Sequence, residues 1–503
     1  MSTPLSTEVL RELQSLLQAH GVRAYLMGGF LRDRILGIPT RDMDVAVEGD
    51  ASAIAHQTTS QMGGRLVPLG ERHQMFRAIL RRGDDTWQVD FSPVHGTLLA
   101  DLARRDFTID AMALPMEDWG EGDWAERLVD PHGGRRDLEL KMVRMVSESA
   151  FREDPARLLR GPRLAVKLGF GLETQTQGLI TRDAQLAATV SGERVRDEFL
   201  AILAMPGARD HLGLLDRLGL LTTLFPELGA AKGVVQPREH YWDVFQHLLE
   251  TASAVERVIR RDDTDAVARE VPWSDGLALH FAEVVSDGYD RAVLLKLAAL
   301  FHDVAKPETK AVDESGRTRF LGHPTRGATT VRDVLERLRM SRRGIDMVCT
   351  MVEDHMRPTQ MSQGGDMPTR RAIYRYFRDV KDVAIDTLYL CLADYLAARG
   401  PLLALDDWQR HVRIVRYILE TGLEEAPDKG KKWVVNGHDL MQVLSIGPGP
   451  FLGEVLDAVH EAQAAGEVGS REDALAWASR YINEERRSRR KTCEEGSLEP
   501  PYS

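Results

Sequence analysis

Two carboxylates, Asp42 and Asp44, follow a pair of adjacent glycines in the segment YLMGGFLRDRILGIPTRDMDVAVEGD, residues 25–50. Residues i and i+2 of a strand project from the same face of a sheet, so both side chains can present oxygen ligands together. Such ligands suit a hard cation such as Mg²⁺. Ions held there could activate a 3′-hydroxyl and neutralise departing pyrophosphate, as in-line nucleotidyl transfer requires. Asp42 and Asp44 are therefore the first catalytic candidates.

The glycine pair predicts a cradle for a polyphosphate. Gly28 and Gly29 form a turn after an expected strand, and glycine lets the backbone approach a phosphate closely. The helix expected next points its N-terminal amides at that turn. Arg32 and Asp33 in this helix are included among the nucleotide-binding candidates.

The sheet that positions these groups is expected from four apolar runs, at 22–27, 43–48, 76–80 and 87–91. Asp90, in the last run, is a candidate third metal ligand, and it fits a surface position on an edge strand equally well. From about residue 136, leucine and alanine recur at three- and four-residue spacing, which indicates helices. The expected fold class is α+β, with a small N-terminal α/β head and an all-α remainder.

Composition limits the partners that the protein can have. The 503 residues are 43% hydrophobic and carry a formal net charge of −12. This length predicts several domains, and the negative charge excludes a histone-like binder, so nucleic-acid binding must depend on local cations. The three widely spaced cysteines fit a reducing compartment. No apolar leader or 18-residue apolar run is present, so we expect a cytoplasmic protein with no membrane partner.

Four further motifs narrow the chemistry: LARRDFTIDAMAL (102–114), LVDPHGGRRDLELKMVR (128–144), FREDPARLLRGPRLAVKLGF (151–170) and SGERVRDEF (191–199). With the glycine pair and the DxD couple, they resemble the DNA polymerase beta nucleotidyltransferase superfamily. Within it they resemble the class II tRNA nucleotidyltransferases, which include CCA-adding enzymes and bacterial poly(A) polymerases. The resemblance covers about residues 20–230. It implies template-free transfer from CTP, or from CTP and ATP, to the 3′ end of a tRNA bound through its acceptor-TΨC arm.

Three neighbours in the first of these motifs combine guanidinium forks with a carboxylate: Arg104, Arg105 and Asp106. They suit a triphosphate and a ribose hydroxyl, although a solvated helix face would look the same. Asp154 and Arg157, three apart after a proline-containing first turn, are expected on one helical face. Alone, such a pair is usually a surface ion pair. The resemblance implies that it selects the base of CTP or ATP, and that Arg160 lies in the same nucleotide pocket.

One departure from the family pattern lies between the DxD and RRDFT motifs. Members that add the terminal A usually carry a flexible basic and aromatic loop there, and WQVDFSPVHGTLLADLARRDFT leaves little room for one. The shortening is similar to the CC-adding branch. We therefore expect addition of C74 and C75, with a separate A-adding enzyme completing the end.

A second constellation lies between residues 240 and 400. Most of its members interrupt apolar helical patterns, where a buried polar group needs a partner: His247, His302, Asp303, His323, His355 and Asp394. Imidazole and carboxylate ligands together suit one or two transition metals that activate water against a phosphate ester. Lys306 and Arg326 are candidates for holding phosphate oxygens.

The order His, His-Asp, His, His, Asp resembles the two-metal members of the HD phosphohydrolase superfamily, over about residues 236–400. The resemblance implies Mn, Ni, Co or Fe at this site and hydrolysis of RNA 3′ phosphates or 2′,3′-cyclic phosphates. A further pair, His438 and Asp439, is not expected to bind metal, because other ligands are missing and the aspartate suits a helix N-terminus. The segment around it resembles the C-terminal, tRNA-binding portion of the nucleotidyltransferases.

Five segments are therefore expected: a nucleotidyltransferase head (1–135), a helical neck with the nucleotide-selecting motif (136–235), an HD domain (236–400), a helical tRNA-binding body (401–483) and a disordered tail (484–503). Three alternatives remain at this point. The chain could be a poly(A) polymerase, an HD phosphohydrolase with a nucleotide-binding head, or a non-catalytic RNA-binding protein. The last would require both metal constellations to be coincidental.

Overall fold

The computed structural model describes residues 4–70, 75–120, 123–362, 367–425 and 433–495. The chain divides into two compact units. The N-terminal unit comprises residues 1–205 and 210–226, and so holds most of the expected head and neck together. The C-terminal unit comprises residues 206–209 and 227–503.

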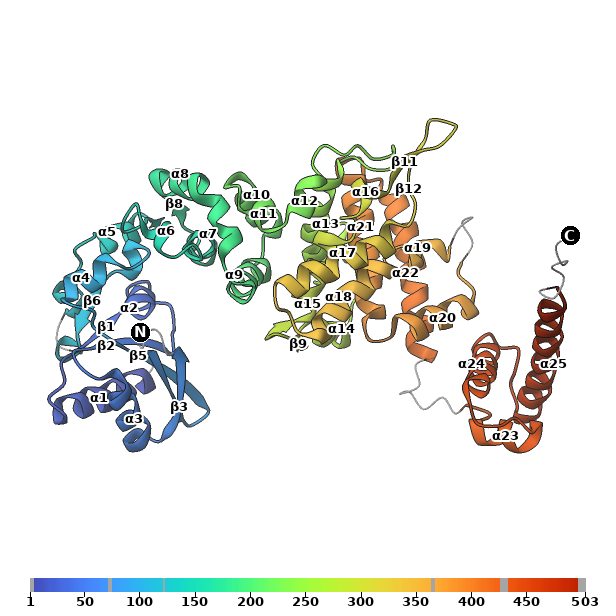
Figure 1. The fold of residues 1–503 in the computed structure, drawn as a ribbon, viewed down its shortest axis with the longest axis horizontal. Helices are drawn as coiled ribbons and strands as arrows, with labels where there is room; N and C mark the ends of the chain where they lie inside the picture. Colours follow the sequence, from blue (N-terminus) through green and yellow to red (C-terminus); the bar gives the residue numbers. More distant parts are fainter. Residues whose placement is uncertain (1–3, 71–74, 121–122, 363–366, 426–432, 496–503) are drawn as a thin grey trace, which may run out of the picture. The chain divides into compact units, whose positions relative to one another are not determined.

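Six strands form one mixed sheet in the described part of the N-terminal unit, in the order β3-β4-β5-β2-β1-β6 (Figure 1). They are β1 (Ala24–Met27), β2 (Asp42–Val47), β3 (Gly64–Gly70), β4 (Met75–Arg82), β5 (Asp85–Pro93) and β6 (Ala113–Pro115). The central strands β2 and β5 run parallel and the other neighbours run antiparallel. The four strands predicted from the sequence are confirmed.

Two strands of this sheet were not predicted, and each has a local cause. β3 contains Pro68, which cannot donate to a ladder and is tolerated because β3 lies at the edge. β6 has three residues, too few to show the alternating apolar pattern that predicts a strand. It forms by pairing with β1.

The helices of the head pack on this sheet. α2 (Gly28–Ile35) contacts β1 and β2, whereas α3 (Ala51–Met62) contacts β3, β4 and β5, with α1 (Pro4–Ala19) packed on α3 (Figure 1). Asp50 starts α3, because its carboxylate accepts the backbone N–H groups of Ser52 and Ala53. α2 therefore begins at the glycine pair, directly beside the strand that carries Asp42 and Asp44.

The helices after the sheet correct one expectation. They include α4 (Leu98–Ala103), α5 (Gly134–Glu139), α6 (Ala150–Glu153), α7 (Arg157–Leu168), α8 (Thr174–Asp183) and α9 (Gly192–Ala204). Asp154 and Arg157 do not share a helical face: α6 ends at Glu153, Asp154 is extended at φ −142°, and α7 begins at Arg157. The cause is Pro155, which disfavours the helical conformation of the preceding residue.

Five helices form the main bundle of the C-terminal unit: α13 (Val244–Val258), α15 (Arg291–Phe301), α17 (His323–Arg337), α18 (Arg342–Asp354) and α21 (Ala384–Arg399). A hairpin of β11 (Lys310–Val312) and β12 (Thr318–Phe320) joins α15 to α17 through the short α16 (Lys306–Thr309) (Figure 1). The described residues hold two more two-stranded sheets, β7 (Met142–Val143) with β8 (Gly171–Leu172) and β9 (Val284–Ser286) with β10 (Tyr289–Asp290). The remainder expected to be wholly helical thus contains short strands.

α22 (Leu405–Glu425) belongs with this bundle rather than with a separate C-terminal body. It buries Trp408, Val412 and Val415, which are spaced by four and three residues on one face. The indole N–H of Trp408 donates to the Val267 carbonyl at 3.0 Å. The boundary expected at residue 401 therefore does not coincide with the packing.

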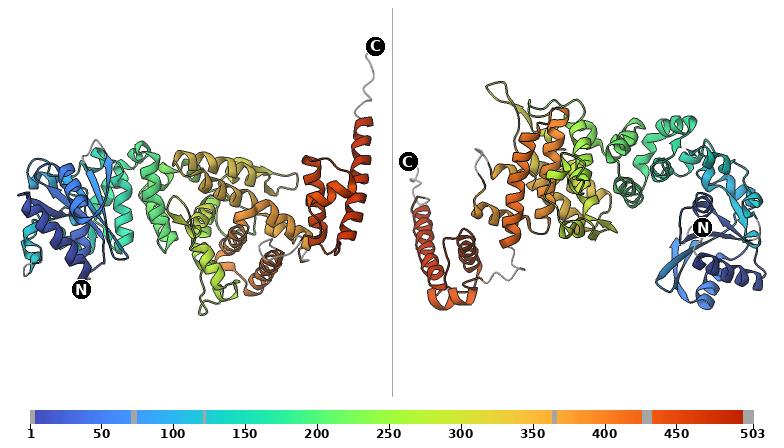
Figure 2. Two further views of the ribbon diagram at one scale, coloured as in Figure 1. Left: turned by 90° about the horizontal axis from the view of Figure 1, so that it is seen from below. Right: turned by 180° about the vertical axis from the view of Figure 1, so that it is seen from behind.

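The last three helices, α23 (Gly437–Leu444), α24 (Pro450–Ala464) and α25 (Arg471–Glu495), lie side by side around their own apolar core (Figure 2). Ala474, Ala478 and Ile482 place the α25 apolar face in that core. α25 runs on to Glu495, so the expectation of disorder is wrong for residues 484–495, where glutamate, arginine and lysine favour a helix. Residues 496–503 of the expected tail lie outside the described residues. In the described part of the chain, no helix is both long and apolar enough for a membrane crossing.

Candidate active sites: a nucleotide cavity and a histidine cluster

The acid couple lies at the centre of the sheet. Asp42 and Asp44 are on β2, and Asp44 is the direct register partner of Asp90 on the parallel strand β5. Opposite residues of paired strands share a face, so Asp44 and Asp90 project together. Burial raises the pKa of Asp44, Arg105 opposes this rise, and the neighbouring carboxylate of Asp90 adds to it. A concentration of acid oxygens at this depth fits a divalent cation, which would favour the ionised carboxylates.

Gly28 shows why the turn before α2 needs glycine. Its φ is +62°, and a Cβ atom built there would lie 3.0 Å from Oδ2 of Asp44 and 3.1 Å from a terminal nitrogen of Arg105. A side chain at this position would strain the backbone and push against the acid couple. The backbone therefore passes directly beside the carboxylate, as a phosphate cradle requires.

A cavity of about 300 Å³ opens beside Asp44. The predicted residues that line it are Gly28, Gly29, Asp44, Arg104, Arg105, Asp106, Asp154, Arg157 and Arg160. Sequence motifs more than a hundred residues apart are thus brought to one opening. We call it the nucleotide cavity.

Four other predicted residues do not line this cavity. Asp42 and Asp33 line a neighbouring cavity of about 710 Å³. Asp90 accepts hydrogen bonds from Nε and from a terminal nitrogen of Arg77 on β4, each at 2.7 Å. In this structure its carboxylate is therefore paired with an arginine. Arg77 was not predicted, because its contact with Asp90 depends on the pairing of β4 with β5.

Arg32, the fourth of these residues, is a buried structural cation. It is 5% exposed, and it donates to Asp33 at 2.8 Å and to Asp110 at 2.6 Å. Asp110 was missed by the sequence reasoning although it lies in the motif 102–114, and it lines the nucleotide cavity. Its second carboxylate oxygen is buried without a hydrogen-bond partner, and burial raises its pKa. The Arg32–Asp110 pair thus supports the cavity wall from behind.

Arginine side chains form ion pairs with two other carboxylates of the nucleotide cavity. Arg160 contacts Asp106 at 2.9 Å, and Arg194 on α9 makes a bidentate pair with Asp154 at 2.9 and 2.8 Å. Burial alone would raise the pKa of Asp154, but the two bonds from Arg194 lower it below its ordinary value. Arg157 lies 4.0 Å from Asp154 and donates instead to the Arg104 carbonyl at 2.9 Å. Asp154 therefore stays ionised and oriented by α9, with Arg157 beside it.

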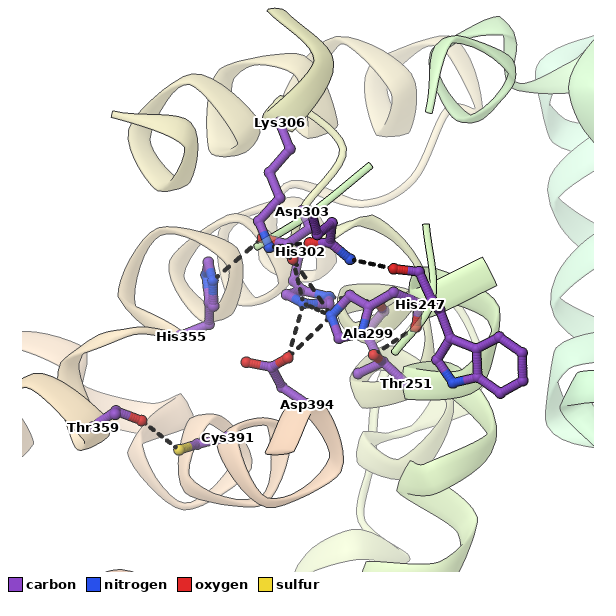
Figure 3. Close-up of polar contacts among 12 residues, drawn as sticks. His247, Thr251, Ala299, His302, Asp303, Lys306, His355, Thr359, Cys391 and Asp394 are labelled. Carbon is purple, nitrogen blue, oxygen red and sulfur yellow. Dashed lines mark hydrogen bonds and ion pairs between the residues drawn. The ribbon is translucent and has the colours of Figure 1, made fainter. Parts of the chain in front are cut away.

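The second constellation forms one cluster in the C-terminal unit, and Figure 3 labels His247, His302, Asp303, His355 and Asp394 among its members. Asp303 is at its centre. Its Oδ2 lies 3.2 Å from Nε2 of His302 and 3.4 Å from Nε2 of His247, whereas its Oδ1 lies 3.1 Å from Nε2 of His323 and 3.7 Å from Nε2 of His355. One carboxylate therefore faces two groups of imidazoles, as a residue shared between two metal ions would.

Asp394 completes the first of these groups. Its Oδ1 lies 3.0 Å from Nε2 of His247 and 3.6 Å from Nε2 of His302. All six predicted residues are thus brought together, from α13, the α15–α16 junction, α17, the end of α18, and α21. We call this set the histidine cluster.

Backbone carbonyls set the orientation of three of the imidazoles. Nδ1 of His302 faces the Ala299 carbonyl at 2.9 Å, and Nδ1 of His323 and His355 face the carbonyls of Phe320 and Val352 at 2.6 and 2.7 Å. An imidazole that donates from Nδ1 keeps the lone pair of Nε2 for a metal. Nε2 of His323 and Oδ1 of Asp303 are buried without a hydrogen-bond partner, which fits a site built for an ion.

The electrostatics of the cluster fit a cation as well. Burial opposes a charge on His302, yet the carboxylates of Asp303 and Asp394 raise its pKa to about 10. Burial and the nearby His302 lower the pKa of His355 to about 4. The two buried carboxylates thus draw positive charge into an apolar bundle, and a divalent ion would supply it.

The surroundings of the cluster differ from expectation in three residues. Lys306 does lie here, but it is engaged by Asp303 at 2.5 Å and by Gln236 at 2.7 Å. Arg326 pairs with Glu308 and does not line the cavity beside the cluster. His240, which was not predicted, lies within 4.8 Å of ligand atoms of the cluster and lines this cavity. Its signal in the sequence, a histidine seven residues before His247, is too common to be read alone.

His438 and Asp439 behave as expected for a helix start. Asp439 and Asn436 form a capping box at the N-terminus of α23, each side chain accepting the backbone N–H of the other. Neither residue is in a metal-competent group among the described residues.

Family comparisons follow the same division of the chain. Residues 24–144 match the family model for the "Poly A polymerase head domain", and residues 169–232 match the "Probable RNA and SrmB- binding site of polymerase A". Residues 244–399 match the HD domain. The histidine cluster lies in the region of the HD model, whereas the nucleotide cavity is lined by residues of the first two models and by Asp154, Arg157 and Arg160 between them.

Relatives with the same organisation match nearly the whole chain. The A-adding tRNA nucleotidyltransferase of Deinococcus radiodurans is 35% identical over 470 residues, which span 92% of this chain and 96% of the relative. This chain belongs to the tRNA nucleotidyltransferase family. Another member, the CC-adding tRNA nucleotidyltransferase of Thermus thermophilus, is 32% identical over 90% of this chain and 92% of its own length.

Solved structures show that the fold is shared as well. A CCA-adding enzyme in complex with CTP superimposes with a TM-score of 0.65 at 20% identity, covering 95% of this chain and 96% of that chain. The Thermotoga maritima CCA-adding enzyme complexed with tRNA gives a TM-score of 0.62 at 20% identity over 95% of this chain and 96% of that chain. The α+β head followed by helices is thus the architecture of the family, and the chain is a nucleotidyltransferase.

Proposed function

We propose that the N-terminal unit transfers CMP from CTP to the 3′ end of a tRNA, without a nucleic-acid template. The observation that carries this proposal is the convergence of Asp44, the glycine turn and the Asp154–Arg194 pair on one cavity, with Asp42 two residues before Asp44 on the same strand. Mg²⁺ bound by Asp42 and Asp44 would polarise the 3′-hydroxyl and neutralise the triphosphate. In the reaction, the 3′-oxygen forms a bond to the α-phosphorus as the bond to pyrophosphate breaks.

Different side chains of the cavity are proposed to bind the triphosphate and to recognise the base. Arg104 and Arg105 are placed to hold the triphosphate beside the glycine turn. Asp154 offers carboxylate oxygens and Arg157 offers N–H groups, which together can pair with the edge of a base. Arg194 keeps Asp154 in one orientation, so that base selection does not depend on a mobile side chain.

We further propose that the enzyme adds C74 and C75 and leaves A76 to a separate A-adding enzyme. β5 ends at Pro93 and α4 begins at Leu98, where Thr97 caps the helix by accepting the N–H of Ala100. This connection has no room for the flexible loop described above. The similar relatives include both A-adding and CC-adding enzymes, so the proposal rests on the short connection.

The histidine cluster is proposed to hydrolyse 2′,3′-cyclic phosphates or phosphomonoesters at RNA 3′ ends. One or two ions of Mn, Ni, Co or Fe held by the cluster would supply an activated water. For a cyclic phosphate, the water oxygen bonds to phosphorus, one ester P–O bond breaks, and the released ribose oxygen takes a proton. The carboxylate of Asp303, shared between two groups of imidazoles, supports a two-ion arrangement.

One assay tests the transferase proposal. Purified protein and Mg²⁺ are incubated with tRNAs that lack one, two or three terminal nucleotides, CTP and ATP are supplied separately, and the products are sized. We expect two C additions and then arrest. Incorporation of A onto a tRNA ending in CC, at a rate that matches C addition, would contradict the CC assignment, and long A tails on any RNA would indicate a poly(A) polymerase.

A further inference from the structure

The cavity beside the histidine cluster is larger than a terminal phosphate requires. It measures about 660 Å³, within the range of sites that hold a whole nucleotide. One wall is formed by Asp303, His323 and His355 of the cluster, and another by Arg317 and Arg319 of the β11–β12 hairpin. Two arginines thus line the same cavity as the metal-competent centre, where Arg317 lies 3.7 Å from Glu239 and Arg319 lies 2.9 Å from Asp313.

The hairpin is coupled to the cluster rather than merely near it. The carbonyl of Phe320, the last residue of β12, is the partner of Nδ1 of His323 at 2.6 Å. The Lys306 ammonium lies 5.5 Å from the centre of the Phe320 ring, a cation–π distance. A group bound against the hairpin is therefore held at a defined distance from the cluster.

A second cavity, of about 170 Å³, adjoins the first. The two share four wall residues, Glu239, Tyr395, Ala398 and Arg399. Arg399 stands on the common wall, where it donates to the Glu239 carbonyl at 3.2 Å and lies 5.3 Å above the Tyr395 ring. A cation on the boundary between two cavities is suitably placed for the phosphate that links two nucleotides.

The outer cavity offers an aromatic surface and another cation. Tyr241 lines it with 49% of its surface exposed, and its backbone N–H donates to the Ala398 carbonyl at 2.8 Å, which fixes its position on the end of α21. Arg238 lines the same cavity. Exposed aromatic rings and cations along a groove are the features with which proteins bind single-stranded nucleic acid.

We propose that the histidine cluster acts on an RNA strand end held in two subsites, with the terminal nucleotide in the larger cavity and the preceding nucleotide in the cavity lined by Arg238 and Tyr241. This inference rests on the phosphohydrolase function proposed above and specifies its substrate. Charge complementarity supports it, because outside the histidine cluster the arginines that line the two cavities, Arg238, Arg317, Arg319 and Arg399, outnumber the acids, Glu239 and Asp407, in a chain that carries −12 as a whole. A free mononucleotide would leave the outer subsite empty.

The test compares substrates of increasing length on the full chain loaded with Mn²⁺. Cytidine 2′,3′-cyclic phosphate is compared with di- and trinucleotides that end in the same cyclic phosphate. We expect kcat/KM to rise about tenfold from one nucleotide to two, from stacking of one base and one added phosphate contact, with little further gain at three. Equal values for one and two nucleotides would overturn the two-subsite inference alone. Absence of hydrolysis of all three would overturn the proposed phosphohydrolase function as well.

Variants locate the outer subsite. Tyr241→Ala and Arg238→Ala are expected to bring the ratio of dinucleotide to mononucleotide kcat/KM towards one, whereas Tyr241→Phe keeps the ring and restores the ratio. Arg326→Ala is the matched control, because Arg326 pairs with Glu308 away from both cavities. An unchanged ratio in Tyr241→Ala would contradict the placement.

A second readout does not depend on turnover. In metal-free buffer, a dinucleotide carrying 4-thiouridine at the penultimate position should photo-crosslink to the peptide that contains Tyr241. A crosslink confined to peptides of the N-terminal unit would overturn the proposed track.

Discussion

The nucleotide cavity and the histidine cluster both bring carboxylates together, but the carboxylates pair with different kinds of side chain in the two sites. In the cavity, Asp106 and Asp154 pair with arginines at nitrogen–oxygen distances of 2.8 to 2.9 Å. In the cluster, Asp303 and Asp394 contact imidazole nitrogens at 3.0 to 3.7 Å, and Asp303 also contacts the Lys306 ammonium at 2.5 Å. Guanidinium groups stay charged and cannot ligate a metal, whereas neutral imidazoles can.

This difference indicates what completes each site. The arginines of the cavity orient carboxylates and attract an anionic ligand that enters and leaves with every cycle. The imidazoles of the cluster are buried, and three are oriented by backbone carbonyls, so they suit an ion that stays bound. The two centres should therefore fail independently, and the following experiments test that comparison.

The largest effect is expected from removing the acid couple. The double variant Asp42→Ala, Asp44→Ala should lower nucleotide transfer by at least about 1000-fold, because the charges that hold the reacting groups are lost. Transfer is measured by extension of a tRNA that lacks its CCA end. Asp118→Ala, at a surface ion pair with Arg127, is the control and should retain full transfer. If hydrolysis of a cyclic phosphate fell together with transfer, the two centres would not be independent.

The reciprocal variants His302→Ala and Asp303→Ala should abolish hydrolysis and metal retention while tRNA extension continues. Elemental analysis after gel filtration measures the bound metal, and we expect a loss of most of it, since Asp303 faces both groups of imidazoles. His438→Ala is a matched control, because His438 belongs to no metal-competent group among the described residues. Retained metal and unaltered hydrolysis in both variants would show that the cluster only stabilises the fold.

A smaller effect is expected from removing Arg194, which orients Asp154, the carboxylate proposed to select the base. Arg194→Ala removes both bonds to Asp154 and should lower kcat/KM for CTP by about 100-fold, through misplacement of the carboxylate, and reduce discrimination against UTP. Arg182→Ala, which removes a guanidinium paired with the buried Asp183 on α8, should have no such effect. Unchanged selectivity for CTP over UTP in Arg194→Ala would show that the orientation of Asp154 does not govern base recognition.

The smallest effect is a pH dependence of stability in the metal-free protein. The pKa of His302 is raised to about 10 in the folded state, against about 6.5 unfolded, so its contribution is complete below pH 6.5 and declines as the pH rises through 10. Between pH 7 and 8, below the titration of the buried thiols of Cys349 and Cys391, the contribution of His302 should fall with a slope that approaches one proton, or about 1.4 kcal/mol per pH unit. The pKa values of His240, His355 and His411 are lowered to about 4, so these groups contribute the opposite sign near pH 7, and the His302 slope is taken as the difference between the wild type and His302→Ala.

Urea unfolding of EDTA-treated protein at pH 7.0, 7.5 and 8.0 measures this slope. His302→Ala should remove it. With Mn²⁺ present the trend should reverse, because metal binding displaces the proton from His302 and is favoured at higher pH. A slope that is the same in the wild type and in His302→Ala would assign the dependence to other groups.

Much of this protein was determined by local sequence. The strands that carry Asp42, Asp44 and Asp90 follow from alternating apolar residues, and the turn at Gly28 follows from a conformation that glycine readily adopts. Most members of the histidine cluster stand out because they place a polar group in an apolar helical pattern, where only a shared partner makes burial favourable. Such signals are local, so they survive in the sequence alone.

Tertiary structure decided which groups face one another. The pairing of β4 with β5 brings Arg77 to Asp90, and the packing of α9 brings Arg194 to Asp154, across 13 and 40 residues of sequence. Arg32 became a buried support rather than a cavity residue, because Asp110, 78 residues away, balances its charge there. An ion pair depends on a distance of a few ångströms between side chains, and that distance is set by the packing of whole elements, which no local pattern encodes.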